Sequence, residues 1–113
     1  MVIWIAGIPP DCASNKEARL THHLKSALSK RLLYTRPSLE EMSIHCVRDQ
    51  ASCIDAYVLV PEGCTEEVFA ALSAEVGRTI AWEFPEVRVS CIVTPIPRSR
   101  MWTNRLLQAF VPR

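Results

Sequence analysis

The sequence lacks the patterns from which phosphate loops, disulfide frameworks and membrane spans are built. Its 113 residues include three glycines, too few for a glycine-rich phosphate loop, and no Walker pattern appears. The five cysteines are odd in number and form no C-x-x-C pair. No apolar run is long enough to cross a bilayer, and the apolar start lacks the basic segment of a signal peptide. The absence of these patterns favours reduced thiols in a cytoplasmic protein with no membrane partner.

Histidine is also scarce, which bears on metal binding. Only three histidines occur, and none has zinc-ligand spacing relative to the cysteines. His22 and His23 are adjacent on an expected helix, so the two rings do not readily face one metal ion. We therefore expect no metal site and no cofactor, and we place both histidines at the surface or its boundary.

Acidic residues are absent from the last part of the chain. Residues 95–113 contain four arginines and no acid, so this segment carries +4 and the rest of the chain −3, for a net charge of +1. Such a tail can meet nucleic acid, an anionic substrate or an acidic neighbour. Nucleic acid is not the expected partner, because apolar residues dominate the segment. Trp102, Leu106 and Phe110 are spaced as in a short amphipathic helix that packs on protein.

The stretch from 55 to 93 predicts a strand, a helix and a second strand. Residues 56–60 are rich in β-branched and aromatic types, and residues 87–91 alternate as a half-buried strand. Between them Thr65 occupies an N-cap position, and Pro85 ends the helix. The helix has one apolar stripe, made by Val68, Leu72, Val76 and Ile80. A strand, a crossover helix and a strand predict a βαβ unit with parallel strands.

The first half of the chain repeats this order. Residues 2–6 and 42–47 predict strands, and Ser14 to Glu17 has the spacing of a capping box. The helix between them has an apolar stripe at Leu20, Leu24, Ala27, Leu28 and Leu32. When the two halves are overlaid, Cys46 matches Cys91, which predicts two thiols packed inside as small hydrophobes.

Composition and length predict a single domain over residues 1–113, with 49% hydrophobic and 22% charged residues. We divide it into a βαβ unit at 2–48, a second unit at 55–94 and a basic tail at 95–113. The expected fold class is α/β (α+β by some schemes), with two tandem βαβ units, a four-stranded sheet and both helices on one face. The alternative is a ferredoxin-like sheet, in which the same element order gives interleaved strands.

Two segments carry a family resemblance. Residues 15–47 read NKEARLTHHLKSALSKRLLYTRPSLEEMSIHCV, and residues 58–93 read VLVPEGCTEEVFAALSAEVGRTIAWEFPEVRVSCIV. Each resembles the unit of 4-oxalocrotonate tautomerase. The tandem arrangement resembles the macrophage migration inhibitory factor branch of the tautomerase superfamily. Residues 95–98, PIPR, resemble the Pro-x-x-Arg end of related bacterial proteins.

The resemblance implies a homotrimer that isomerises small keto–enol carboxylates. In that family an amino-terminal proline is the base and an arginine holds the substrate carboxylate. Burial lowers the pKa of an α-amine, which suits proton transfer near neutrality. Here Val2 follows Met1 where the family has proline, so Val2 supplies the catalytic amine only if Met1 is removed.

Four further residues complete the expected site. Arg88 matches a family arginine, and Arg98, Arg100 and Trp102 follow the last strand closely enough to join it in substrate binding. The alternative is that Arg88 makes a structural ion pair with Glu86 or another acid and that the tail arginines are solvated. The expected function is a tautomerase-like isomerase, altered or inactive because Val2 replaces proline. The competing function is a binding or assembly module without catalysis.

Overall fold

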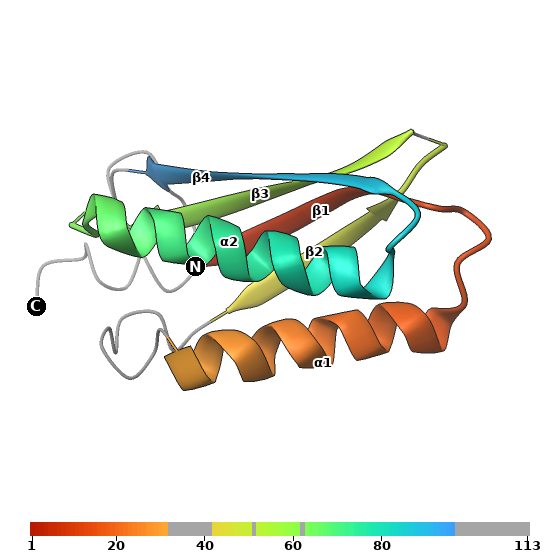
Figure 1. Ribbon diagram of the computed structural model, residues 1–113, viewed down its shortest axis with the longest axis horizontal. Helices are drawn as coiled ribbons and strands as arrows, with labels where there is room; N and C mark the ends of the chain where they lie inside the picture. Colours follow the sequence, from red (N-terminus) through yellow and green to blue (C-terminus); the bar gives the residue numbers. More distant parts are fainter. Residues whose placement is uncertain (32–41, 51, 62, 97–113) are drawn as a thin grey trace, which may run out of the picture.

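The computed structural model describes residues 1–31, 42–50, 52–61 and 63–96. Two helices and four strands follow one another in the order expected from the sequence (Figure 1). The first unit consists of β1 (Val2–Ile8), α1 (Ser14–Arg31) and β2 (Ser43–Arg48). The second consists of β3 (Cys53–Pro61), α2 (Glu66–Glu83) and β4 (Arg88–Ile96).

The four strands form one mixed sheet in the order β2-β1-β3-β4. Each helix connects two neighbouring parallel strands, β1 with β2 and β3 with β4. The two units meet where β1 runs antiparallel to β3, with Val2 opposite Leu59. The tandem βαβ arrangement is therefore confirmed. The interleaved ferredoxin-like alternative is wrong for this chain, because each crossover returns to the strand beside its own starting strand.

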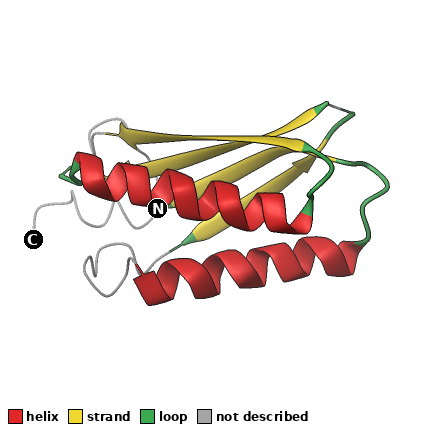
Figure 2. Cartoon of the chain, viewed as in Figure 1, coloured by secondary structure: helices red, strands yellow, loops and turns green. Residues whose placement is uncertain are grey.

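Both helices cover the same face of the sheet (Figure 2). They run antiparallel to each other, as the sequence colours of Figure 1 show. Alternation along β1 and β3 sends Ile3, Ile5 and Val58 under the helices, where they are fully buried. The helices contribute their apolar stripes, in which the buried residues are Leu20, Leu24, Leu28, Leu72, Val76 and Ile80. The core thus fills one layer between sheet and helices, and none of the described helices packs on the other, open face of the sheet.

The register displays the internal repeat directly. Cys46 pairs with Ile5, Ile5 pairs with Ala56, and Ala56 pairs with Cys91. The two cysteines matched by the sequence overlay therefore lie in one row across the sheet, on its two outer strands. Both thiols are partly buried and pack against the core.

The helix starts follow different rules. Thr65 caps α2 as predicted, because its Oγ1 accepts a hydrogen bond from the backbone N–H of Val68 at 3.3 Å. In α1 the carbonyl of Ala13 accepts the backbone N–H of Glu17 at 3.3 Å, so Ser14 lies inside the first turn. The N-cap position of α1 is therefore Ala13, one residue before the Ser14 that the capping-box spacing predicted.

Two strand boundaries also differ from expectation. β3 begins at Cys53 rather than at residue 56, because Cys53 and Asp55 keep pairing with β4. β4 begins at Arg88 and continues to Ile96, so Pro95 and Ile96 belong to the sheet and not to the tail. Pro95 fits because β4 is an outer strand, where a missing N–H on the open side costs no ladder bond.

A tight loop connects β1 to α1. The pairing register shifts between Ala6 and Ile8, and Gly7 has φ +94°. A Cβ atom at Gly7 would collide with the carbonyl oxygen of Cys53. Arg48 then holds the loop, donating to the carbonyls of Pro10 at 3.0 Å and Cys12 at 2.6 Å.

Neither of the described helices is long and apolar enough to span a membrane.

Candidate functional site

The amino terminus lies at one end of the sheet, at the start of a central strand. Val2 pairs with Ser43 on one side and with Leu59 on the other. The backbone N–H of Ser43 donates to the Met1 carbonyl at 3.1 Å. These bonds hold the first residues in place, so the chain's amine is positioned by the ends of three strands. We call this region the amino-terminal edge, defined by Met1, Val2 and Ser43.

Met1 is partly buried, and this changes the chemistry of its amine. Burial lowers the pKa of the Met1 amine from its ordinary value of 8.0, and the nearby Cys64 thiol partly opposes this effect. Desolvation acts in this direction because it disfavours the ammonium form. A lower pKa leaves more of the amine unprotonated near neutral pH, which is the state that a proton-accepting base requires.

On the open face of the sheet, starting from Ser43 of the amino-terminal edge, three side chains contact one another. The rings of Trp4 and His45 stack with centroids 4.5 Å apart and planes 21° apart. His45 Nε2 lies 2.6 Å from Ser43 Oγ, in a hydrogen bond whose direction follows the tautomer of the ring. The alternation of β2 predicted that Ser43 and His45 share a face. Their approach to Trp4 required the β1–β2 register.

Arg88 lies at the other end of the sheet. It pairs with Cys53, whereas Val2 pairs with Leu59. At about 3.3 Å per residue, the six steps from Cys53 to Leu59 separate the two positions by about 20 Å. Arg88 is exposed on the open face, as its alternation predicted. Arg88 and the amine of the same chain therefore cannot contact one small ligand.

Arg88 has polar neighbours that sequence reasoning did not bring together. Ser90 Oγ donates to Asp55 Oδ1 at 2.6 Å, and Cys53 Sγ lies 3.7 Å from Asp55 Oδ2. Strand alternation could have placed residues 53 and 55 on one face of β3, and residues 88 and 90 on one face of β4. Only the register of β3 with β4 brings these two pairs next to each other. Within the described part of the chain Arg88 makes no ion pair, so the alternative pairing with Glu86 is not observed there.

The remaining predicted site residues are Arg98, Arg100 and Trp102. They lie outside the described residues, so their part in substrate binding stays a prediction. Among residues 1–31, 42–50, 52–61 and 63–96, no group of three or more histidine, cysteine or acidic side chains is arranged to hold a metal ion.

The fold matches solved structures of the tautomerase superfamily over nearly the whole chain. A wild-type fused 4-OT symmetric trimer, Q0, has a TM-score of 0.78 at 14% identity and covers 98% of this chain and 100% of its own. N1, a member of the cis-3-chloroacrylic acid dehalogenase family, has a TM-score of 0.72 at 11% identity. The match covers 99% of this chain and 93% of the N1 chain. Pt0534, whose structure was solved after inactivation by 2-oxo-3-pentynoate, has a TM-score of 0.71 at 16% identity. The match covers 92% of this chain and 93% of the Pt0534 chain.

No protein-family model matches the sequence, and no curated protein matches it. The chain therefore has the fold of these structures, which is the fold that the resemblance implied, and at 11% to 16% identity the matches show the fold alone.

Proposed function

We propose that this protein is a trimeric, tautomerase-like isomerase of small 2-oxo carboxylates, altered by the absence of an amino-terminal proline. The observation that supports it most directly is the partly buried amine at the start of β1, whose pKa is lowered. The fold match supports it as well, since Pt0534 is inactivated by a 2-oxo acid derivative.

The proposed chemistry is a proton transfer. The unprotonated amine takes the O–H proton of the enol, and the electron pair of that bond forms the keto C=O. The C=C pair then takes a proton from the resulting ammonium at the adjacent carbon, which forms the C–H bond and returns the amine to its unprotonated state. The base here is a primary amine, on Met1 or on Val2 after removal of Met1. Arg88 binds the substrate carboxylate through charge-assisted hydrogen bonds. Because Arg88 lies at the far end of the sheet, it must come from a neighbouring copy.

The open face of the sheet supports assembly of several copies. Trp4 pairs with Tyr57, and Tyr57 pairs with Ile92, so three large side chains form one row across β1, β3 and β4. They are 42%, 43% and 55% exposed. An apolar row of this kind, uncovered in one chain, is typical of an interface. Q0 and F6, two of the fused 4-OT matches, are described as trimers, which supports three copies here. A cytoplasmic location stays a prediction from the cysteine content.

The test is an enol–keto assay on an aromatic 2-oxo acid, followed by loss of the enol absorbance. Selective acetylation of the α-amine should reduce kcat/KM on the order of 10²-fold, the lower end of what a general base contributes. Val2→Pro, with Met1 removed and the mass verified, should raise kcat/KM above that of the unchanged chain. Val2→Ala, also trimmed, is the matched control because it exposes a primary amine again.

Two results would count against the proposal. If acetylation leaves a measurable rate unchanged, the amine is not the base. If the unchanged protein and the trimmed Val2→Pro variant are both inactive while remaining folded trimers, the competing function, an assembly or binding module without catalysis, is the better description.

A further inference from the structure

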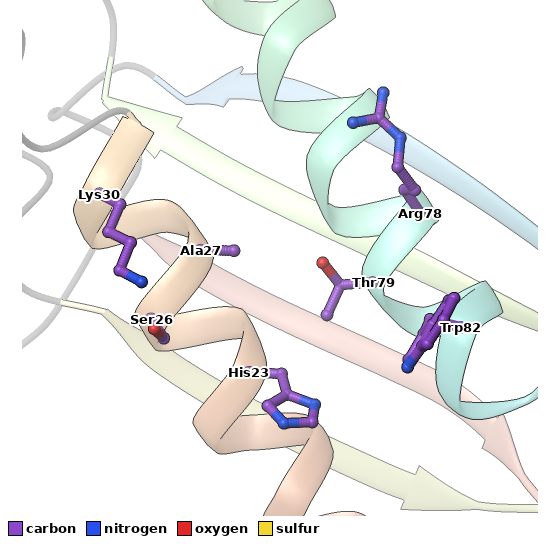
Figure 3. Close-up of a pocket in the computed structure, with 7 residues that line it drawn as sticks. All are labelled: His23, Ser26, Ala27, Lys30, Arg78, Thr79 and Trp82. Carbon is purple, nitrogen blue, oxygen red and sulfur yellow. The ribbon is translucent and has the colours of Figure 1, made fainter.

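A cavity of ≈ 400 Å³ that is largely open to solvent lies between the two helices, on the covered side of the sheet (Figure 3). α1 contributes His23, Ala27 and Lys30, and α2 contributes Arg78, Thr79 and Trp82. The volume is within the range of pockets that take small organic ligands, about 300–1,000 Å³. The cavity shares no residue with the amino-terminal edge or with Arg88.

The shape of the cavity follows from the side chains at the crossing of the helices. Ala27 and Thr79 face each other in Figure 3 and are small, so the helices leave space above the core. The Thr79 hydroxyl already donates a hydrogen bond to the Glu75 carbonyl at 2.8 Å, so its proton does not need an acceptor on a ligand. Trp82 forms one wall. Its side chain is 79% exposed, which is the largest exposure among the described large apolar residues.

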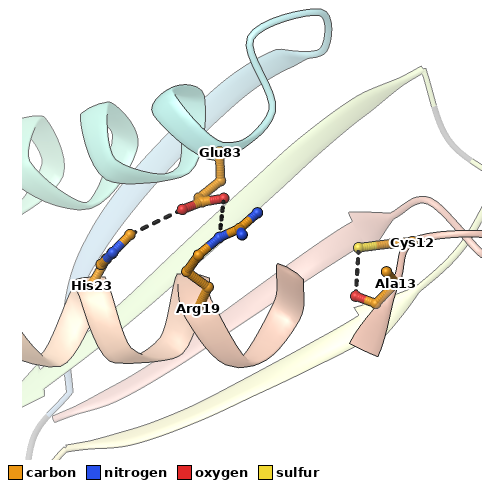
Figure 4. Close-up of polar contacts among 5 residues, drawn as sticks. All are labelled: Cys12, Ala13, Arg19, His23 and Glu83. Atoms are coloured by element: carbon orange, nitrogen blue, oxygen red, sulfur yellow. Dashed lines mark hydrogen bonds and ion pairs between the residues drawn. The ribbon is translucent and has the colours of Figure 1, made fainter. Parts of the chain in front are cut away.

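The charge around the cavity has one sign. Lys30 lines it from α1 and Arg78 from α2, and no acidic residue lines it. In Figure 3 the Lys30 side chain lies over α1 and the Arg78 guanidinium points along α2, away from Trp82. The nearest carboxylates are already engaged. Glu83 is buried and binds His23 Nδ1 at 2.9 Å and Arg19 Nε at 3.4 Å (Figure 4). Glu75 lies 3.5 Å from Arg78, whose side chain is 67% exposed and keeps further donors for a ligand.

We propose that this cavity binds a small planar aromatic carboxylate. The aromatic ring lies against the Trp82 indole, where offset stacking and burial of both surfaces stabilise it. The carboxylate is held by Arg78 and Lys30, whose exposed side chains turn toward the space between the helices and supply charge-assisted hydrogen bonds. An aromatic wall with cations and no acid selects for this combination, since an uncharged ring would gain the stacking alone.

The proposed site is independent of the proposed catalytic function. The helices cover one face of the sheet, and the apolar row proposed as an interface lies on the other (Figure 2). The cavity therefore stays open to solvent in an assembly built through the open face. Binding at the cavity should survive acetylation of the α-amine, which would block the amino-terminal edge.

The test is calorimetric titration of the intact protein with 2-naphthoate and, as its uncharged match, 2-naphthamide. We expect 2-naphthoate to bind and 2-naphthamide to bind about tenfold more weakly, the effect of one charge-assisted hydrogen bond. Trp82→Ala should weaken 2-naphthoate about tenfold through lost stacking and burial. Because Trp82 is exposed, this variant should keep the thermal unfolding midpoint of the unchanged protein.

The charged residues supply the second arm of the test. Arg78→Gln and Lys30→Gln should each weaken 2-naphthoate and leave 2-naphthamide unchanged. Lys25→Gln, on an exposed position of α1 outside the cavity, is the matched control and should change neither. The proposal is overturned if 2-naphthoate does not bind at millimolar concentration, if both compounds bind equally, if Trp82→Ala has no effect, or if acetylation of the α-amine abolishes binding.

Discussion

At the scale of single residues, Gly7 is the position that tolerates no side chain. Its φ of +94° is unfavourable for any L-residue, and a Cβ would also collide with the carbonyl of Cys53 on β3. Gly7→Ala should therefore lower the free energy of unfolding by about 1–3 kcal/mol or more, the cost of a strained backbone position. Urea denaturation followed by circular dichroism measures the change.

The other two glycines are matched controls for this prediction. Gly63 has φ +102° and no atom within 4 Å of the added Cβ, so Gly63→Ala should cost only the backbone term, about 1–2 kcal/mol. Gly77 lies inside α2, with Cys91 Cβ at an ordinary 3.7 Å, so Gly77→Ala should stabilise by about 0.4–1 kcal/mol. If Gly7→Ala and Gly63→Ala lower the free energy of unfolding equally, the collision with Cys53 adds nothing to the cost at Gly7.

At the scale of elements, the end of α2 is tied to α1 through a buried acid. The Glu83 side chain is 6% exposed and receives Arg19 and His23 from the other helix. Arg19→Ala should lower stability by about 1 kcal/mol, since it removes one partner of a buried carboxylate while His23 remains. Arg78→Ala, at a more exposed pair within one helix, should change stability by less than about 0.5 kcal/mol. A double-mutant cycle of Arg19 with Glu83 measures the coupling.

The outer strands β2 and β4 each carry one partly buried thiol. Burial raises the pKa of Cys91 to about 11, and burial with the nearby Glu17 carboxylate raises the pKa of Cys46 to about 11. Since the thiolate is the reactive form, labelling of both should be slow at pH 8 and should keep accelerating up to about pH 11. Cys12 and Cys64, which lie beside turns, should be labelled sooner. Mass-spectrometric mapping after timed labelling measures the order.

The same two thiols predict how stability depends on pH. Their pKa values are higher in the folded protein than the ordinary 9.0, so the folded state holds these protons more tightly than the unfolded state. Their contribution is complete below pH 9 and is lost as pH rises from 9 through 11. Replacing both by Ala should flatten this part of the curve of unfolding free energy against pH. An unchanged slope would contradict the assignment.

At the scale of the whole molecule, the open face of the sheet governs assembly. We expect a trimer of the 12.8 kDa chain, about 38 kDa by light scattering at micromolar concentration. Ile92→Lys places a charge in the row with Trp4 and Tyr57 and should shift the mass toward one chain. Trp82→Lys is the matched control, because Trp82 is more exposed but lies on the helical side, and it should leave the mass unchanged. A monomer mass for the unchanged protein would refute the trimer.

The sequence by itself determined the parts of this protein that depend on local periodicity. Alternation and the helical stripes predicted the order of elements, the parallel strands within each unit and the inward side of Cys46 and Cys91. The cap at Thr65 followed from the identity of one residue and its place before an apolar stripe. The missing glycine-rich loops and zinc-ligand spacings were equally readable, since such motifs are local.

Tertiary structure alone decided which of those parts meet. Periodicity carries no information on how β1 pairs with β3, and that antiparallel junction places Arg88 about 20 Å from the start of β1 in the same chain. It also assembles the row of Trp4, Tyr57 and Ile92 from three strands. The cavity between the helices arises in the same way, because Ala27 and Trp82 belong to helices whose approach is fixed by the shared core beneath them. Contacts between distant segments depend on register and packing, which a local pattern does not encode.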